Sequence, residues 1–121
     1  MKWKTPAKIA RVSSKTNGRC AYCGSGHGSM VLDHVIPKSS GGGNADENLL
    51  LACWACNASK GVKSLEQFRL SRRCLAIFEE QRFSIGQMEW LERNGLLDQL
   101  PIVPDTYVFY FETLPPQGGD L

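Results

Sequence analysis

Residues 19–61 read RCAYCGSGHGSMVLDHVIPKSSGGGNADENLLLACWACNASKG, and this stretch decides the fold. Its two ends carry Cys-x-x-Cys pairs, Cys20 with Cys23 and Cys53 with Cys56, and 29 residues lie between the pairs. Each pair can present two thiolates from one tight turn, and two such turns brought together make the tetrahedral sulfur site that zinc prefers. The quartet therefore predicts a structural zinc site that fastens the ends of this stretch and helps a small domain to fold.

Two disulfides or a redox dithiol are the competing interpretations of the quartet. A redox Cys-x-x-Cys normally stands alone at a helix start in a thioredoxin-like unit, and the sequence shows no such unit. Five cysteines in a chain that we expect to be cytoplasmic favour a metal site over disulfides. The fifth, Cys74, lies among apolar residues of an expected helix and is predicted to be a small buried residue.

The segment between the two pairs is predicted to be a β-hairpin with a long loop. Met30–Ile36 is a short apolar run that Pro37 ends, and Leu49–Ala52 is a second such run. The glycine-rich residues 39–44 connect them. Asn57 is expected to open a helix directly after the second cysteine pair.

Helices are expected on both sides of this stretch. Cap and stop signals predict helices over residues 5–15, 64–81 and 84–95. Residues 106–113 alternate aromatic with β-branched residues, which predicts a C-terminal strand. We therefore predict an α+β fold in one domain.

That domain would span residues 1–121, with a core over 19–61 and a helical and strand extension over 62–117. Of the 121 residues, 42% are hydrophobic and 21% are charged, which is an ordinary globular balance. The net charge of +2 is only a weak pointer to polyanions.

No membrane partner is expected, because no apolar run is long enough to cross a bilayer. The basic N-terminus is not followed by an apolar signal core, since Pro6, Lys8 and Arg11 interrupt it. We therefore expect a cytoplasmic protein of the bacterial or phage-type intracellular kind.

Four polar residues lie within or directly beside the cysteine frame: Asp33, His34, Asn48 and Asn57. Hydrolysis of a phosphodiester needs an activated water, for which histidine is suited because its pKa lies near neutrality. It also needs stabilisation of negative charge, for which a divalent cation with oxygen ligands is suited. Asp33 and Asn57 could supply two such oxygens. Adjacent strand residues point to opposite faces, so Asp33 and His34 could meet at one phosphate only if the strand bends there.

The motifs of residues 19–61 resemble those of HNH endonucleases in order and rough spacing. The resemblance covers 43 residues, about a third of the chain. It rests on Arg19–Gly24, Leu32–Ser39, Gly41 with Gly42, Asn48–Leu50 and Cys53–Gly61.

The resemblance implies a ββα-metal (His-Me finger) fold, in which a hairpin and a helix hold one catalytic ion. By position, His34 resembles the general base, and Asn48 resembles the residue that braces the loop and orients His34. Asp33 and Asn57 resemble the ligands of the catalytic ion. An amide is a weaker ligand than histidine for transition metals, which favours Mg²⁺ or Mn²⁺ over zinc in the catalytic site.

The implied function is a metal-dependent endonuclease that leaves 5′-phosphate and 3′-hydroxyl ends. The expected substrate is double-stranded DNA, nicked on one strand per site with low sequence specificity by a monomer or weak homodimer. Lys38, Lys60 and Lys63 flank the motif and are expected to contact phosphates, with plain solubility as the alternative. RNA as the substrate stays open.

Each polar assignment has a structural alternative. Asp33 could orient His34 without touching an ion, and Asn57 could be a helix N-cap. For the whole chain the alternative is a zinc-ribbon module that binds nucleic acid without cutting it, which the presence of all four polar residues disfavours.

Other aromatic and histidine residues are expected to have no part in the chemistry. Trp54 is predicted to pack over the zinc site, with base stacking as the alternative. Tyr107, Phe109 and Phe111 are predicted to share one strand face in the core. His27 is expected to be exposed, with DNA contact or zinc binding as alternatives.

Overall fold

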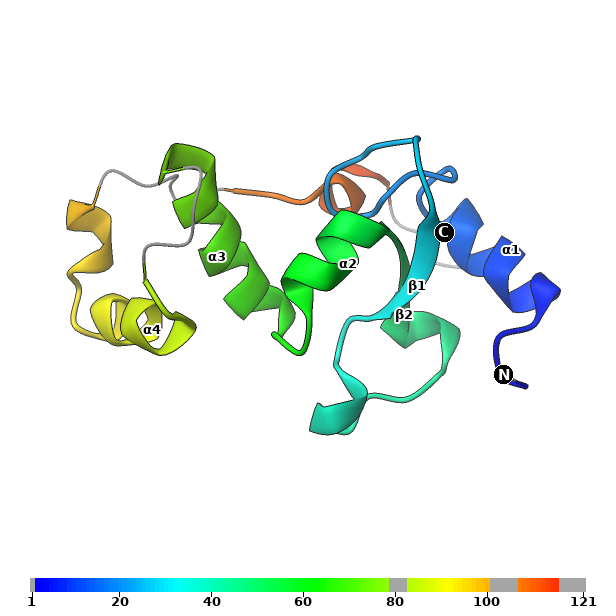
Figure 1. The fold of residues 1–121 in the computed structure, drawn as a ribbon, viewed down its shortest axis with the longest axis horizontal. Coiled ribbons are helices and arrows are strands. Elements are labelled where there is room, and N and C mark those ends of the chain that lie inside the picture. Colours follow the sequence, from blue (N-terminus) through cyan, green and yellow to red (C-terminus); the bar gives the residue numbers. More distant parts are fainter. Residues whose placement is uncertain (1, 79–82, 101–106, 116–121) are drawn as a thin grey trace. The chain divides into compact units, whose positions relative to one another are not determined.

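The computed structural model describes residues 2–78, 83–100 and 107–115, with the backbone alone for 75–78 (Figure 1). The chain groups into two compact units. The knuckle unit comprises Met1–Ser64 with Val108–Leu121, and the helical unit comprises Leu65–Tyr107. The expected single domain stays a prediction, because compactness alone does not show which part folds independently.

The knuckle unit is built on the predicted hairpin. Strand β1 (Met30–His34) pairs antiparallel with β2 (Leu49–Cys53), and the register runs from Met30 opposite Cys53 to His34 opposite Leu49. Helix α2 (Trp54–Lys60) follows β2 directly, so the order is strand, strand, helix (Figure 1). The α+β fold with a ββα core is therefore confirmed.

Helix α2 begins three residues before the expected start at Asn57. The Cys53 Sγ accepts a hydrogen bond from the Cys56 N–H at 3.4 Å, so this cysteine caps the helix. A thiol is an unusual cap, and sequence rules that look for Ser, Thr, Asp or Asn do not recognise it. The alternative of Asn57 as the N-cap is wrong.

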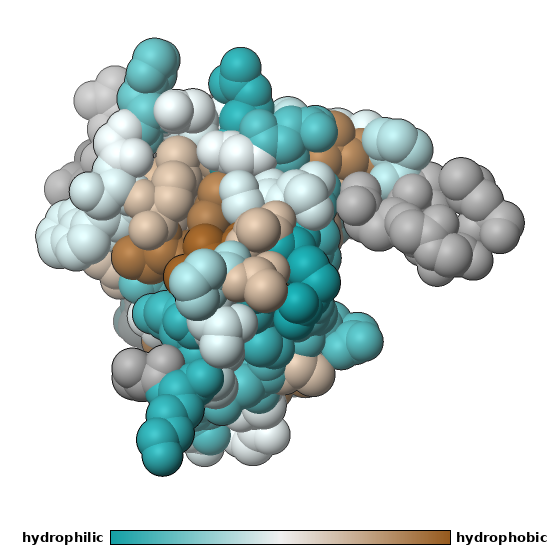
Figure 2. All heavy atoms as spheres, turned by 90° about the vertical axis from the view of Figure 1, so that its right-hand side faces the viewer, coloured by the Kyte–Doolittle hydropathy of each residue, from teal (hydrophilic) through white to brown (hydrophobic). Residues whose placement is uncertain are grey.

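Helix α1 (Pro6–Ser14) precedes the hairpin and packs on it. The Thr5 hydroxyl caps the helix by accepting from the Lys8 N–H at 3.1 Å, as the sequence predicted. Buried residues from α1 and both strands form one core, namely Val12, Leu32, Leu49 and Leu51, against which Trp3 and Met30 pack. Part of this apolar surface is visible from outside between α1 and β1, where Ile9, Met30 and Val31 line a hollow (Figure 2).

The loop between the strands is tied to α1 by charge. Lys8 Nζ lies 2.9 Å from Asp46 and donates to the Asn44 carbonyl at 2.7 Å, and Arg11 Nε lies 2.7 Å from Asp46. The hydrogen bonds from Arg11 and then Lys8 hold the pKa of the Asp46 carboxyl well below its usual range. Asp46 therefore stays ionised under all ordinary conditions and keeps the loop against α1.

The helical unit contains α3 (Leu65–Phe78), α4 (Ile85–Arg93) and a short 3₁₀ turn at Leu97–Gln99. The predicted capping box of α4 is confirmed, because Ser84 and Gln87 exchange hydrogen bonds of 2.9 and 3.1 Å. The predicted end of α3 near residue 81 lies outside the described residues. The core of this unit comprises Leu70, Met88, Leu97 and the fully buried Cys74, whose predicted role is confirmed.

The predicted strand at 106–113 is wrong over the part that the structure describes. Tyr110–Thr113 form a 3₁₀ turn. Phe111 donates its N–H to the Ala21 carbonyl at 2.8 Å, and Glu112 accepts from the Phe109 N–H at 2.8 Å and turns the chain. The aromatic residues therefore serve packing against the first cysteine pair and not a sheet, and Phe109 is 1% exposed.

None of the described helices is both long and apolar enough to span a lipid bilayer.

Candidate active site

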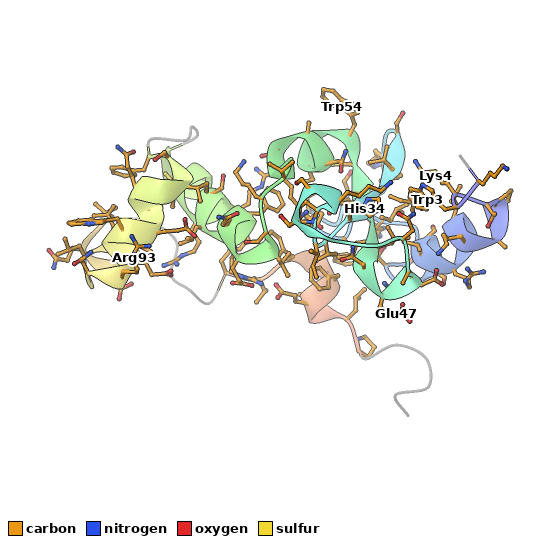
Figure 3. The ribbon with its side chains drawn as sticks, turned by 90° about the horizontal axis from the view of Figure 1, so that it is seen from below. Trp3, Lys4, His34, Glu47, Trp54 and Arg93 are labelled. Carbon is orange, nitrogen blue, oxygen red and sulfur yellow. The ribbon has the colours of Figure 1, made fainter. Side chains whose placement is uncertain are left out.

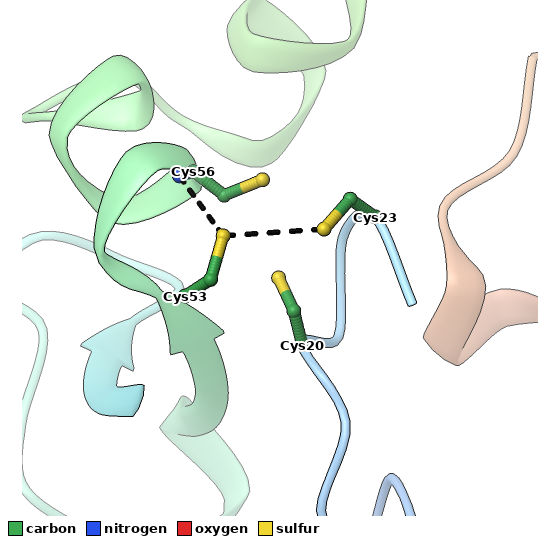
Figure 4. Close-up of side chains that lie close together, drawn as sticks. All are labelled: Cys20, Cys23, Cys53 and Cys56. Carbon is green, nitrogen blue, oxygen red and sulfur yellow. Dashed lines mark hydrogen bonds between the residues drawn. The ribbon is translucent and has the colours of Figure 1, made fainter. Parts of the chain in front are cut away.

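The four cysteines of the frame come together at one end of the hairpin (Figure 4). Cys20 and Cys23 come from the turn after α1, and Cys53 and Cys56 come from the junction of β2 with α2. All four Sγ atoms lie within 4.8 Å of one another, and those of Cys23 and Cys53 are 3.9 Å apart. A tetrahedral zinc ion with bonds of about 2.3 Å sets its sulfurs about 3.8 Å apart, so the cluster fits zinc.

The Cys20 and Cys56 side chains of this cluster are joined by a hydrogen bond. The hydrogen bond between Cys20 and Cys56 lowers the pKa of Cys20 to about 4 and raises that of Cys56. A thiolate is the form that binds zinc, so the cluster already favours one ligand in its binding state. His27 is exposed and is not a member of the metal-binding group found among the described residues.

His34 is the last residue of β1 and is half-buried. Its Nε2 lies 2.8 Å from the Asn44 side-chain oxygen, and its ring meets the Trp3 ring edge-on at 5.3 Å (Figure 3). An amide oxygen only accepts, so this contact fits the neutral tautomer in which Nε2 is the donor and Nδ1 has the lone pair. The sequence does not predict either partner: Asn44 lies in the glycine-rich connection, and nothing in the sequence relates Trp3 to His34.

The Asn48 side chain braces the loop that follows His34. Its oxygen accepts from the Ile36 N–H at 2.8 Å, and its nitrogen donates to the carbonyls of Ile36 and Gly43 at 3.0 Å each. This set of bonds is the arrangement that the expected bracing role requires. These bonds hold the loop closed, and within it the Gly42 backbone lies close to the Ile36 carbonyl and to the Asn48 side chain.

We expect Gly42→Ala to destabilise the knuckle unit by about 1–3 kcal/mol, a typical cost of overpacking. A Cβ on Gly42 would lie 1.7 Å from the Ile36 carbonyl oxygen and 2.8 Å from the Asn48 side-chain nitrogen, so the braced loop would have to open. Urea unfolding would measure the change. Gly43→Ala is the matched control, because its Cβ would meet nothing within 4 Å, and equal stability of the two variants would contradict the prediction.

Asp33 lies on the other face of β1 from His34 and is 4% exposed. Its Oδ2 accepts from the Tyr22 hydroxyl at 2.5 Å and lies 3.2 Å from Lys60 Nζ. Its Oδ1 has no protein partner among the described residues. Burial, and then the charge of Asp33, raise the pKa of Tyr22 far above its ordinary value, so Tyr22 stays a donor.

The bend that would turn Asp33 and His34 to the same side is not found in β1. Pairing stays regular through His34 opposite Leu49, and the Val35 N–H continues it to the Asn48 carbonyl at 2.9 Å. The side chains of Asp33 and His34 therefore have partners on different elements.

Lys60 is buried in the structure, although the sequence predicted that it contacts a phosphate. The side chain is fully buried, and Nζ donates to the His34 carbonyl at 2.9 Å in addition to its ion pair with Asp33. It is enclosed by protein and not presented to a phosphate. Asn57 precedes it by three residues, so both side chains lie on one face of α2, and the Asn57 side-chain amide has no protein partner among the described residues.

Replacing Lys60 with methionine is expected to lower the free energy of unfolding by about 3–5 kcal/mol, because it leaves the Asp33 carboxylate buried without its cation. Chemical denaturation at neutral pH would measure it. Lys63→Met serves as the control, since the Lys63 side chain is half-buried and, among the described residues, donates only to the Ser59 carbonyl. If Lys60→Met lowers the free energy of unfolding no more than Lys63→Met does, the ion pair with Asp33 is not needed for stability.

The remaining side chains predicted near the site lie at the surface. Lys38 is exposed, with its Nζ 5.2 Å from the centre of the Trp3 ring. Trp54 is 68% exposed at the start of α2, so the prediction that it packs over the zinc site is wrong (Figure 3). Its position as the first residue of the helix turns the indole outward.

The segment that contains the cysteine pairs and the four polar residues is similar to known proteins. The family model described as HNH endonuclease matches residues 20–63. The HNH resemblance is confirmed. The CRISPR-associated endonuclease Cas9 of Corynebacterium diphtheriae is 42% identical over 50 residues, which cover 39% of this chain and 5% of that Cas9. The HNH segment thus contains both cysteine pairs and all four polar residues, while the likeness covers a small part of the Cas9 chain.

Proposed function

We propose that this protein is a metal-dependent endonuclease that hydrolyses phosphodiester bonds in DNA. The observation that carries the proposal is the HNH match over residues 20–63, a segment that contains His34, Asp33, Asn48 and Asn57. The similar protein from Corynebacterium diphtheriae is a CRISPR-associated endonuclease, which supports the same chemistry.

His34 is the general base of this proposal. Its Nδ1 takes the proton from the attacking water, and the hydrogen bond from Nε2 to Asn44 holds the ring in the required tautomer. Asn48 keeps the following loop closed and so fixes the end of β1. Asp33 and His34 lie on opposite faces, so the scissile phosphate must lie at the strand end, which adjoins both faces.

Asp33 Oδ1 and the Asn57 side-chain oxygen are the groups that would hold the catalytic cation. Both are hard oxygen donors, and neither has a protein partner among the described residues, which fits Mg²⁺ or Mn²⁺. When bound, such an ion stabilises the charge that develops on the phosphate and on the leaving oxygen. Zinc in the cysteine cluster has no open position, so its role is structural.

The proposed substrate is double-stranded DNA, cut on one strand at a time with low sequence specificity. Lys38 and Lys63 are the proposed phosphate contacts, and the exposed Trp54 is free to contact a base. One site in each chain supports nicking by a monomer or weak homodimer. The products would carry a 5′-phosphate and a 3′-hydroxyl.

Supercoiled plasmid incubated with the zinc-loaded protein and Mg²⁺ or Mn²⁺ tests this proposal. Relaxed circles that disappear when the divalent ion is withheld, and that DNA ligase alone can seal, would support nicking and the proposed ends. Linear product from the first time point would indicate cutting of both strands. Plasmid that is retarded in a gel but intact would support the zinc-ribbon binding module, and a parallel reaction with structured RNA decides between the substrates.

A further inference from the structure

Tyr22 occupies the middle of the first cysteine pair and reaches from there to the centre of the proposed chemistry. It is 4% exposed, lies between Cys20 and Cys23, and donates its hydroxyl proton to Asp33 Oδ2 at 2.5 Å. Asp33 is on β1, eleven residues later in the chain. The zinc cluster and the catalytic carboxylate are therefore one side chain apart.

The C-terminal segment packs against the Tyr22 ring. Phe109 and Phe111 meet it edge-to-face at 5.2 and 6.3 Å, and the Tyr110 N–H donates to the Tyr22 carbonyl at 3.2 Å. A ring packed in this way has little freedom to move its hydroxyl. The bond to Asp33 is accordingly held in place by packing as well as by its own energy.

The two donors to Asp33 act on the same oxygen. The Tyr22 hydroxyl and Lys60 Nζ both approach Oδ2, which leaves Oδ1 without a protein partner. The oxygens of a free carboxylate are equivalent and exchange by rotation of the group, and donors on one side remove that freedom. A pre-oriented ligand loses less entropy when it binds a cation.

We propose that Tyr22 is a positioning residue of the catalytic centre, which holds Asp33 Oδ2 so that Oδ1 is directed to the divalent cation. Through it, the structural zinc site and the C-terminal aromatic residues set the affinity for the catalytic ion. This inference rests on the proposed function, because it assumes that Asp33 is a ligand. A buried tyrosine that serves stability alone would not alter cation affinity.

Tyr22→Phe removes the hydroxyl and keeps the ring. We expect the variant to keep zinc and its fold but to bind Mn²⁺ at least about tenfold more weakly. A loss of this size is usual when a residue that hydrogen-bonds a metal ligand is replaced. The measurement is titration of zinc-loaded protein with Mn²⁺, followed by the electron paramagnetic resonance signal of free Mn²⁺ in the absence of DNA. Zinc content and urea unfolding are determined for each sample.

Tyr110→Phe is the matched control, since it removes a hydroxyl from the neighbouring aromatic segment, and Asp33→Asn marks the catalytic site. Wild-type Mn²⁺ affinity in Tyr22→Phe, with Asp33→Asn weakened, would overturn this inference and leave the proposed function intact. Absence of Mn²⁺ binding by the wild-type protein would overturn both. If Tyr22→Phe loses zinc, Phe111→Leu replaces it as the variant, and unchanged Mn²⁺ affinity there would overturn the inference.

Discussion

Replacement of His34 with alanine is expected to lower the rate of DNA cleavage by about 10²–10⁴-fold, the usual contribution of a general base. The fold should persist, because the side chain is half-buried, and its contacts among the described residues are one hydrogen bond to Asn44 and an edge contact with Trp3. The truncated site leaves the Asn44 amide open to water. Single-turnover nicking of supercoiled plasmid, with protein in excess, would measure the rate of the chemical step.

The chain provides its own control for this variant. His27 is the other of the two histidines and is exposed in the loop after the first cysteine pair, so His27→Ala should cut at the wild-type rate. Cleavage by His34→Ala at the wild-type rate, with a normal thermal transition, would remove His34 from the mechanism. Unfolding of that variant would instead show that the contact with Trp3 is needed for stability.

Loss of the structural zinc is expected to have the largest effect on stability. Zinc held by four thiolates contributes roughly 10–16 kcal/mol of apparent binding free energy at neutral pH, and that energy is folding energy when the site forms only in the folded chain. The buried apolar side chains of the hairpin strands form only a small core, namely Leu32, Leu49, Leu50, Leu51 and Ala52. Cys20→Ala should therefore abolish zinc binding and leave the knuckle unit unfolded at room temperature.

Cys74→Ala is the matched variant, because Cys74 is buried in the core of the helical unit and lies outside the metal-binding group. It should retain about one zinc per chain, the capacity of a single four-cysteine site. Metal analysis and the dispersion of amide NMR signals would report zinc content and folding for both variants. A folded knuckle unit in Cys20→Ala would show that the hairpin does not depend on the ion.

The cysteine cluster, the hairpin and the starts of α1 and α4 could be predicted from the sequence because their signals are local. Cysteine spacing fixes which turns can present two thiolates, and the Ser84–Gln87 and Thr5 caps depend on atoms three residues apart. The order of Asp33, His34, Asn48 and Asn57 within that frame also sufficed to indicate the resemblance to HNH endonucleases, which the match over residues 20–63 confirmed.

Only the tertiary structure decided what surrounds each of these residues. The hydroxyl of Tyr22 on Asp33, the ring of Trp3 on His34, and the return of Phe109 to the first cysteine pair join residues far apart in sequence. Lys60 looks like a surface lysine in any sequence window, and its burial depends on a carboxylate supplied by β1. Local propensity carries no information about such contacts, because burial and charge pairing become defined only once the strands, α2 and the C-terminal segment have packed together.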